Sequence, residues 1–110
     1  MGNDPAFLIA FDLRDRTLDY DAAVKYILDS DDFEAWWNHM PGVFLVITRL
    51  RPDEISDRLR AFTKESNLLV VRVDLEDSEG RLSRRAWNWI NKRAAGRESA
   101  SLVAGDTGRH

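Results

Sequence analysis

The chain has 110 residues and no cysteine, so it is about the size of one domain, and disulfides, thiolate metal sites and cysteine nucleophiles are excluded. A content of 44% hydrophobic and 32% charged residues is typical of a globular protein and excludes a disordered chain. The net charge of −3 is unevenly distributed: residues 1–80 carry nine Lys or Arg and seventeen Asp or Glu, a balance of −8, whereas residues 81–97 carry six Lys or Arg and no acid.

The first expected element is a buried strand over residues 6–13, which form an apolar run. The run is too short to span a membrane, which takes about 20 apolar residues. In an extended strand Phe7, Ile9 and Phe11 share one side, and the other side is also apolar until Asp12. The start of the chain has no basic segment leading into an apolar one, so we expect a cytoplasmic protein with no membrane contact.

An amphipathic helix is predicted over residues 19–29, with Thr17 or Asp19 as its N-cap. The next six residues, 29–34, contain four acids. They lack the glycine and the distal glutamate of a calcium loop, so a solvated turn is favoured over a cation site. Residues 35–40 fit either a short strand or a continuation of the helix.

In the middle of the chain, residues 43–75, the sequence predicts a strand, a helix and a second strand. Pro41-Gly42 is a turn signal, and residues 43–48 are rich in β-branched and aromatic residues, which predicts a strand. A second amphipathic helix is expected over residues 52–64, because proline suits the first helical position and acids follow it. Residues 68–75 predict another strand.

This order of elements predicts an α+β fold, the ferredoxin-like βαββαβ sandwich, in which two helices cover one face of an antiparallel sheet. The predicted strands are apolar on both faces. A large apolar face is rarely left in water, so we expect it to be covered by a second subunit, by a C-terminal helix, or by both. The sequence therefore predicts a homodimer.

A C-terminal helix is expected from Arg81 onward, with Leu82, Ala86, Trp89, Ile90 and Arg93 in one stripe and Trp87 on another side. Two interpretations stay open: the helix docks on the acidic body, which we favour, or it binds RNA or DNA. In the second case arginine neutralises phosphates and an indole stacks on a base. The candidate nucleic-acid-binding residues are Arg81, Arg84, Arg85, Trp87, Lys92 and Arg93. We expect one domain over residues 1–95 and a flexible polar tail over residues 96–110.

Other catalytic patterns have little support. His39 is the only histidine before the expected tail, and beside a turn it is more often structural or exposed than a general base. No serine or threonine lies in a recognisable triad pattern, and no glycine-rich phosphate loop is present.

The sequence resembles a known family. Phe-Leu-Ile-Ala-Phe-Asp-Leu at 7–13, the Trp-Trp pair at 36–37 and Leu-Leu-Val-Val at 68–71 are similar to the SinR-like proteins, which are relatives of the second CRISPR-associated protein and of the VapD ribonuclease toxins. The resemblance implies a ferredoxin-like fold and sheet-mediated dimers. In some members it also implies metal-dependent nuclease activity that uses an Asp at the end of the first strand, a position held here by Asp12.

Two interpretations of Asp12 follow. Two copies of Asp12 across a twofold axis would hold one Mg²⁺ or Mn²⁺ as a catalytic metal site. Alternatively, Asp12 caps a turn or pairs with Arg14 or Arg16, which we favour. The function predicted from sequence is therefore a dimeric module that acts through protein or nucleic-acid contacts, and the alternative is a metal-dependent endoribonuclease.

Overall fold

The computed structural model describes residues 4–95, which divide into two compact units, residues 4–73 and residues 74–95. The first unit contains β1 (Ala6–Phe11), α1 (Tyr20–Asp29), β2 (Phe33–Met40), β3 (Val43–Thr48), α2 (Pro52–Thr63) and β4 (Leu68–Val73), and the second contains α3 (Arg84–Ala95). The expected tail, 96–110, lies outside the described residues, and a single domain over residues 1–95 stays a prediction. None of the helices described within residues 4–95 is long and apolar enough to cross a membrane.

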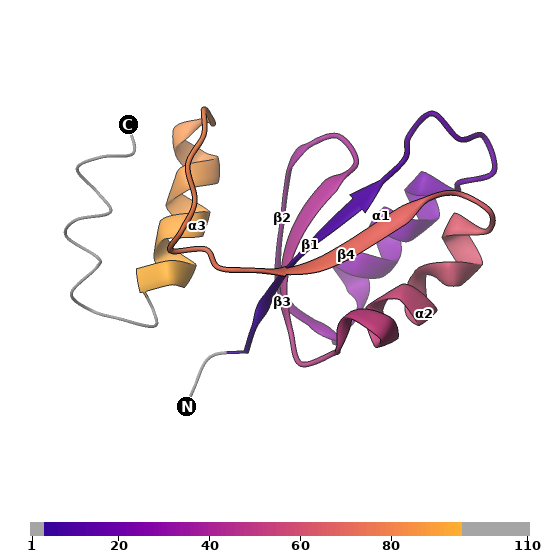
Figure 1. Cartoon of the computed structure of the whole chain (residues 1–110), viewed down its shortest axis with the longest axis horizontal. Helices are drawn as coiled ribbons and strands as arrows, with labels where there is room; N and C mark the ends of the chain where they lie inside the picture. The colour runs from indigo at the N-terminus through magenta and orange to yellow at the C-terminus, as the bar shows by residue number, and fades with distance from the viewer. Residues whose placement is uncertain (1–3, 96–110) are drawn as a thin grey trace. The chain divides into compact units, whose positions relative to one another are not determined.

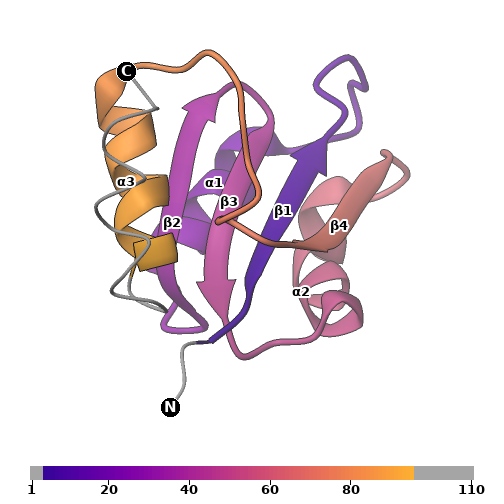
Figure 2. The same ribbon diagram turned by 60° about the vertical axis from the view of Figure 1, so that its left-hand side comes forward.

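The strands form one antiparallel sheet in the order β2-β3-β1-β4 (Figures 1 and 2). β1 lies between β3 and β4, so that Leu8 is opposite both Leu45 and Val71. Both α1 and α2 lie on the same side of the sheet in Figure 1. The prediction of a ferredoxin-like α+β fold is confirmed.

Local signals in the sequence set the ends of the helices. The Asp19 side chain accepts a hydrogen bond from the backbone N–H of Ala22 at 3.2 Å, which caps α1 as expected. Proline opens α2, and the side chain of Glu54 accepts a hydrogen bond from the backbone N–H of Arg51 at 2.9 Å. Each interaction satisfies a donor that the first turn of a helix leaves without an intrahelical partner.

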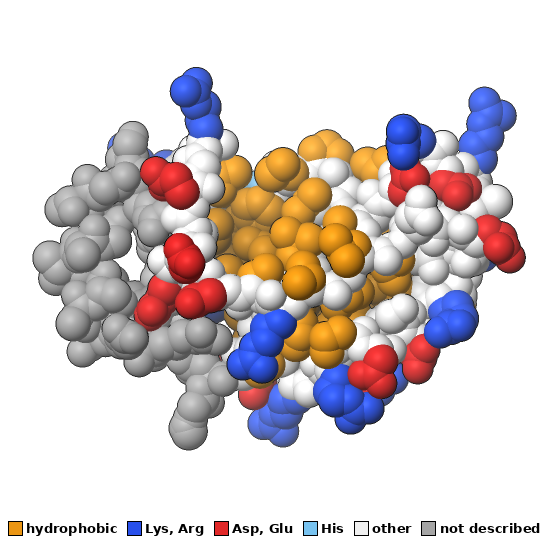
Figure 3. Space-filling view, in the orientation of Figure 1, with side chains coloured by type: hydrophobic (Ala, Val, Ile, Leu, Met, Phe, Trp, Pro, Cys, Tyr) orange, Lys and Arg blue, Asp and Glu red, His pale blue; other side chains and the backbone are white. Residues whose placement is uncertain are grey.

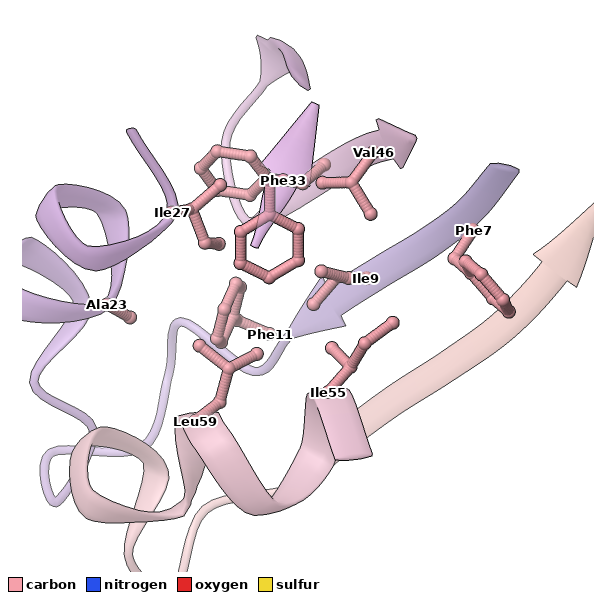
Figure 4. Packing of buried hydrophobic residues seen from close by; sticks show 10 residues of the cluster. Phe7, Ile9, Phe11, Ala23, Ile27, Phe33, Val46, Ile55 and Leu59 are labelled. Carbon is pink, nitrogen blue, oxygen red and sulfur yellow. The ribbon is translucent and has the colours of Figure 1, made fainter. Parts of the chain in front are cut away.

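The core of the first unit lies between the sheet and the two helices (Figure 4). Its largest fully buried side chains include Phe44, Ile9, Ile27, Ile55 and Leu59. In Figure 4, Ile27 of α1 and Leu59 of α2 point toward Phe11 and Ile9 of β1. Because the residues facing this core alternate along each strand, the intervening residues form the second face of the sheet.

β2 is a strand, which settles the ambiguity that the sequence left over residues 35–40. Its pairing with β3 shifts register between Phe33 and Ala35 and again between Trp37 and Met40. Trp36 and Trp37 are on opposite sides of the strand, because Trp36 pairs with Val46 and Trp37 with Leu45. Trp36 is 40% exposed, whereas Trp37 is buried.

The turn between β2 and β3 contacts the end of β1. Gly42 has a φ of +79°, a conformation that glycine adopts without steric cost. Its carbonyl accepts a hydrogen bond from the Phe11 N–H at 2.8 Å, and its own N–H donates to the Tyr20 hydroxyl at 3.0 Å. The turn thus ties the β2–β3 hairpin to β1 and to the start of α1.

In the second unit, α3 begins at Arg84, later than the sequence predicted. Ser83 caps it: the Ser83 hydroxyl accepts a hydrogen bond from the Ala86 N–H at 3.2 Å, and the Ser83 carbonyl accepts one from the Trp87 N–H at 3.1 Å. Arg81 and Leu82, which the sequence placed in the helix, therefore precede it.

Candidate functional site

The second face of the sheet is apolar throughout. Residues that pair directly across an antiparallel ladder share a face, and the pairing therefore defines this surface. We call it the second face. Its members are Ala6, Leu8, Ala10, Ala35, Trp37, Met40, Val43, Leu45, Ile47, Leu69, Val71 and Val73. The prediction that the strands are apolar on both faces is confirmed for the sheet of residues 4–73.

Exposure on the second face lies at its two edges, in β4 and at the end of β2. Leu69 is 58% exposed, Val71 is 42% exposed and Met40 of β2 is 46% exposed, whereas the other members of the face are buried or partly buried. In Figure 3 hydrophobic side chains gather in the middle of the view, over the region where Figure 1 draws β1 and β4. We call Leu69, Val71 and the partly buried Val73 the β4 strip. It is an adjacent pair of exposed residues and their partly buried neighbour on the sheet face that the sequence predicted to be covered by a second subunit, by a C-terminal helix, or by both.

Asp12 follows the last residue of β1, and its carboxylate is held by local hydrogen bonds. Its Oδ1 accepts from the backbone N–H of Arg14 at 3.1 Å and from Arg14 Nε at 3.0 Å. Its Oδ2 accepts from Arg14 Nη2 at 3.3 Å and from Asn67 Nδ2 at 3.5 Å. The Arg14 hydrogen bonds lower the pKa of Asp12. This geometry agrees with the turn-capping and Arg14-pairing interpretation.

A metal at Asp12 would have to compete with these donors for both carboxylate oxygens. Among residues 4–95 there is no group of three or more His, Asp or Glu side chains that could hold a metal ion. The metal site predicted from sequence needs Asp12 of a second copy, and so it stays a prediction.

The acidic segment 29–34 is tied to both helices. The Asp29 carboxylate pairs with Lys25 at 2.9 Å, and Asp32 Oδ2 accepts hydrogen bonds from the Tyr26 hydroxyl at 2.9 Å and from Arg58 Nε at 3.1 Å. The hydrogen bond from Tyr26 lowers the pKa of Asp32, and the Arg58 guanidinium lowers it further by a smaller amount. The sequence did not indicate the Arg58 contact, because 26 residues separate the two side chains.

A cleft of about 490 Å³ lies beside this segment. Its lining residues are Asp4, Asp31, Asp32, Glu34, Thr48, Arg49 and Leu50. Arg49 pairs with Asp4 at 3.6 Å, and the Thr48 hydroxyl donates to the Asp32 carbonyl at 2.6 Å. Asp4 and Asp32, two acids of the cleft, thus each pair with an arginine, which agrees with the solvated turn favoured from the sequence.

On α3 the exposed face is basic. Arg84, Arg85, Asn88 and Lys92 are exposed, and residues 81–95 contain no acid. Arg81, the remaining basic candidate before the helix, is exposed as well.

The expected positions of the α3 tryptophans are reversed. Trp87 is 3% exposed, so its assignment as an exposed residue that stacks on a base is wrong. The buried set is Ala86, Trp87, Ile90 and Ala94, which recurs at helical spacing. Trp89 is only partly buried, and the guanidinium of Arg93 lies 4.9 Å from the centre of its ring. This distance is typical of a cation–π contact.

His39, the single histidine of the described residues, is exposed and its ring lies 5.1 Å from the ring of Trp37. This exposed position agrees with the interpretation favoured from sequence.

No protein-family model, curated protein or solved structure matches this chain. The resemblance to the SinR-like proteins therefore stays a prediction.

Proposed function

We propose that this protein is a homodimeric binding module whose two copies meet at the β4 strip. The observation that supports this proposal is the exposure of Leu69 and Val71 beside one another on an apolar sheet face. Isolated exposed apolar side chains are common and need no explanation. Here, however, the two side chains continue a surface that has no polar residue, which is typical of a surface that meets another protein.

The proposal is tested by sedimentation velocity on the wild-type protein and on two matched variants. Leu69→Lys places a charge in the β4 strip, and Leu28→Lys places the same charge on α1, where Leu28 is 42% exposed. We expect the wild type to be dimeric at about 100 µM. Leu69→Lys should weaken the dimer at least about tenfold, because it replaces an apolar contact between the two copies with a charged side chain at two symmetric positions. Leu28→Lys should leave the dimer unchanged. A wild-type monomer at this concentration, or equal effects of the two variants, would contradict the proposal.

A second proposal is that the module contacts nucleic acid with the exposed face of α3. The supporting observation is that Arg84, Arg85 and Lys92 are exposed on a helix without acids, and that Asn88 lies among them. Guanidinium and ammonium groups bind phosphate oxygens, and an amide can bind phosphate or a base edge. Trp89, which is in cation–π contact with Arg93, places an aromatic ring next to this face. The balance of −8 over residues 1–80 opposes binding at long range, so contact must be local.

Fluorescence anisotropy with a single-stranded RNA of about 20 nucleotides tests this second proposal. Binding should weaken with salt, with a slope of about −0.7 for each phosphate contact on a single strand. Replacing Arg85 or Lys92 with Glu, one at a time, should lower affinity and reduce the slope. Arg16→Glu, at an exposed position in the β1–α1 connection, is the matched control. If Arg16→Glu lowers affinity as much as a single change on α3, the contact is not specific to the helix.

A further inference from the structure

The two edges of the sheet differ in regularity. β2 forms one edge, and its register against β3 shifts at two places. β4 forms the other edge, and all its residues from Leu68 to Val73 pair with consecutive residues of β1 without a shift. Bulges and irregular pairing are devices that protect an edge strand from pairing with another chain. β2 has this protection, and β4 does not.

The composition of β4 also favours pairing. The strand has neither proline nor glycine, and Arg72 is its only charged residue. Within residues 4–95 its ladder partner is β1 alone, so that alternate backbone N–H and C=O groups point away from the sheet. A regular edge strand with exposed apolar side chains is a template for an added strand.

We propose that β4 of one copy pairs antiparallel with β4 of a second copy across a twofold axis. The inference rests on the homodimer proposed above and specifies how its two copies meet. The result is one continuous sheet of eight strands, twice the four of a single copy. We propose a second copy as the partner because a twofold axis pairs β4 with β4 of that copy. Both β4 edges are then covered, and the assembly is a closed dimer. If β4 paired with β2 of another copy, it would have to pair with the irregular edge strand. One β2 edge and one β4 edge would also stay uncovered, so the assembly would remain open at both ends.

The faces of the sheet restrict the register. Two residues that are directly opposite in the β4–β4 pair must be on the same face of the sheet. The twofold axis must therefore relate one residue of β4 to its own copy, and it cannot lie midway between two successive residues. An axis at Arg72 would oppose two guanidinium groups. An axis at Val71 opposes Val71 to its own copy and Leu69 to Val73 of the second copy, whereas an axis at Val70 brings together fewer members of the β4 strip. We therefore place the axis at Val71.

Cysteine cross-linking tests this register cleanly, because the chain has no cysteine of its own. Opposed Cβ atoms in such a pair are about 5 Å apart, close to the separation that a disulfide needs. Val71→Cys should form a disulfide-linked dimer under mild oxidation. Leu69→Cys alone should not, because the two copies of residue 69 would be about 13 Å apart along the strands. A mixture of the Leu69→Cys and Val73→Cys variants should form the linked heterodimer.

The outcomes separate this inference from the homodimer proposal. If the wild type sediments as a dimer but Leu8→Cys forms the linked dimer in place of Val71→Cys, the copies meet face to face and edge pairing is overturned, while the homodimer stands. Linking through Val70→Cys in place of Val71→Cys would overturn the register, because the twofold axis would then lie at Val70. The side chain of Val70 is on the opposite face of the sheet, toward the helices. A monomeric wild type overturns both proposals. Circular dichroism of each cysteine variant, compared with the wild type, verifies that the substitutions leave the fold intact.

Discussion

At the scale of single residues, Asp32 links stability to pH. The hydrogen bond from Tyr26 and the ion pair with Arg58 lower the pKa of Asp32 in the folded protein. An aspartate with a depressed folded pKa contributes stability above its unfolded pKa of about 3.9, and this contribution is lost as the pH falls through the folded value. We therefore expect the free energy of unfolding to fall below about pH 4, in part because of Asp32.

Urea unfolding at a series of pH values measures this dependence. Asp32→Asn should lower stability at pH 7 and make the decline below about pH 4 shallower, because the variant no longer has the group that titrates. Asp31→Asn, at the exposed neighbouring residue, is the control and should keep the wild-type slope. An Asp32→Asn variant with the full wild-type decline would show that Asp32 does not contribute to it.

Asp12 allows a separate prediction about metal binding. Its carboxylate oxygens already accept hydrogen bonds from Arg14, whose guanidinium also repels a cation. We expect Mn²⁺ and Mg²⁺ at millimolar concentration to leave the melting temperature of the wild type unchanged. A rise in melting temperature that Asp12→Ala abolishes would contradict this expectation and would favour the metal-dependent endoribonuclease alternative.

At the scale of elements, the helices contribute stability through the side chains that they bury. Leu59 of α2 is fully buried in the core, whereas Leu28 of α1 is 42% exposed. Leu59→Ala should lower the free energy of unfolding by about 2–5 kcal/mol, because it removes buried methyl groups and leaves a cavity. Leu28→Ala should cost well under about 1 kcal/mol. Urea unfolding of both variants measures the difference. Equal losses would mean that α2 does not pack against the sheet as described.

The elements also show where sequence reasoning succeeds. α1, α2 and β3 follow from periodicity and from local caps such as Asp19, so their positions could be predicted closely. β2 was ambiguous because Phe33–Met40 mixes aromatic, acidic and amide residues, and only pairing with β3 makes it a strand. In α3 the buried face was misassigned, because Trp87 and Trp89 are both plausible core residues and local periodicity does not fix which face is buried.

The candidate sites also differ in how far the sequence predicts them: short-range contacts could be predicted, and contacts between distant elements could not. The contact of Asp12 with Arg14 spans two residues and could be predicted from the sequence. The contact of Asp32 with Arg58 depends on how α2 lies beside the start of β2, and no local pattern encodes it. The contrast between the irregular β2 edge and the regular β4 edge is likewise a property of pairing between strands. Sequence reasoning found the apolar faces but not which part of them is exposed.

At the scale of the whole molecule, dimerisation predicts that thermal stability depends on protein concentration. When a dimer unfolds and dissociates in one step, mass action favours the folded state at higher concentration. With about 0.7 kcal/mol of unfolding enthalpy per residue over the described part of both copies, the melting temperature should rise by about 4 °C for each tenfold increase in concentration. Differential scanning calorimetry from about 5 to 500 µM measures the slope. Leu69→Lys should flatten the slope and Leu28→Lys should preserve it, because only the first substitution changes the β4 strip. A wild-type melting temperature that is constant over this range would mean that the exposed apolar residues of β4 contribute no association energy to the fold.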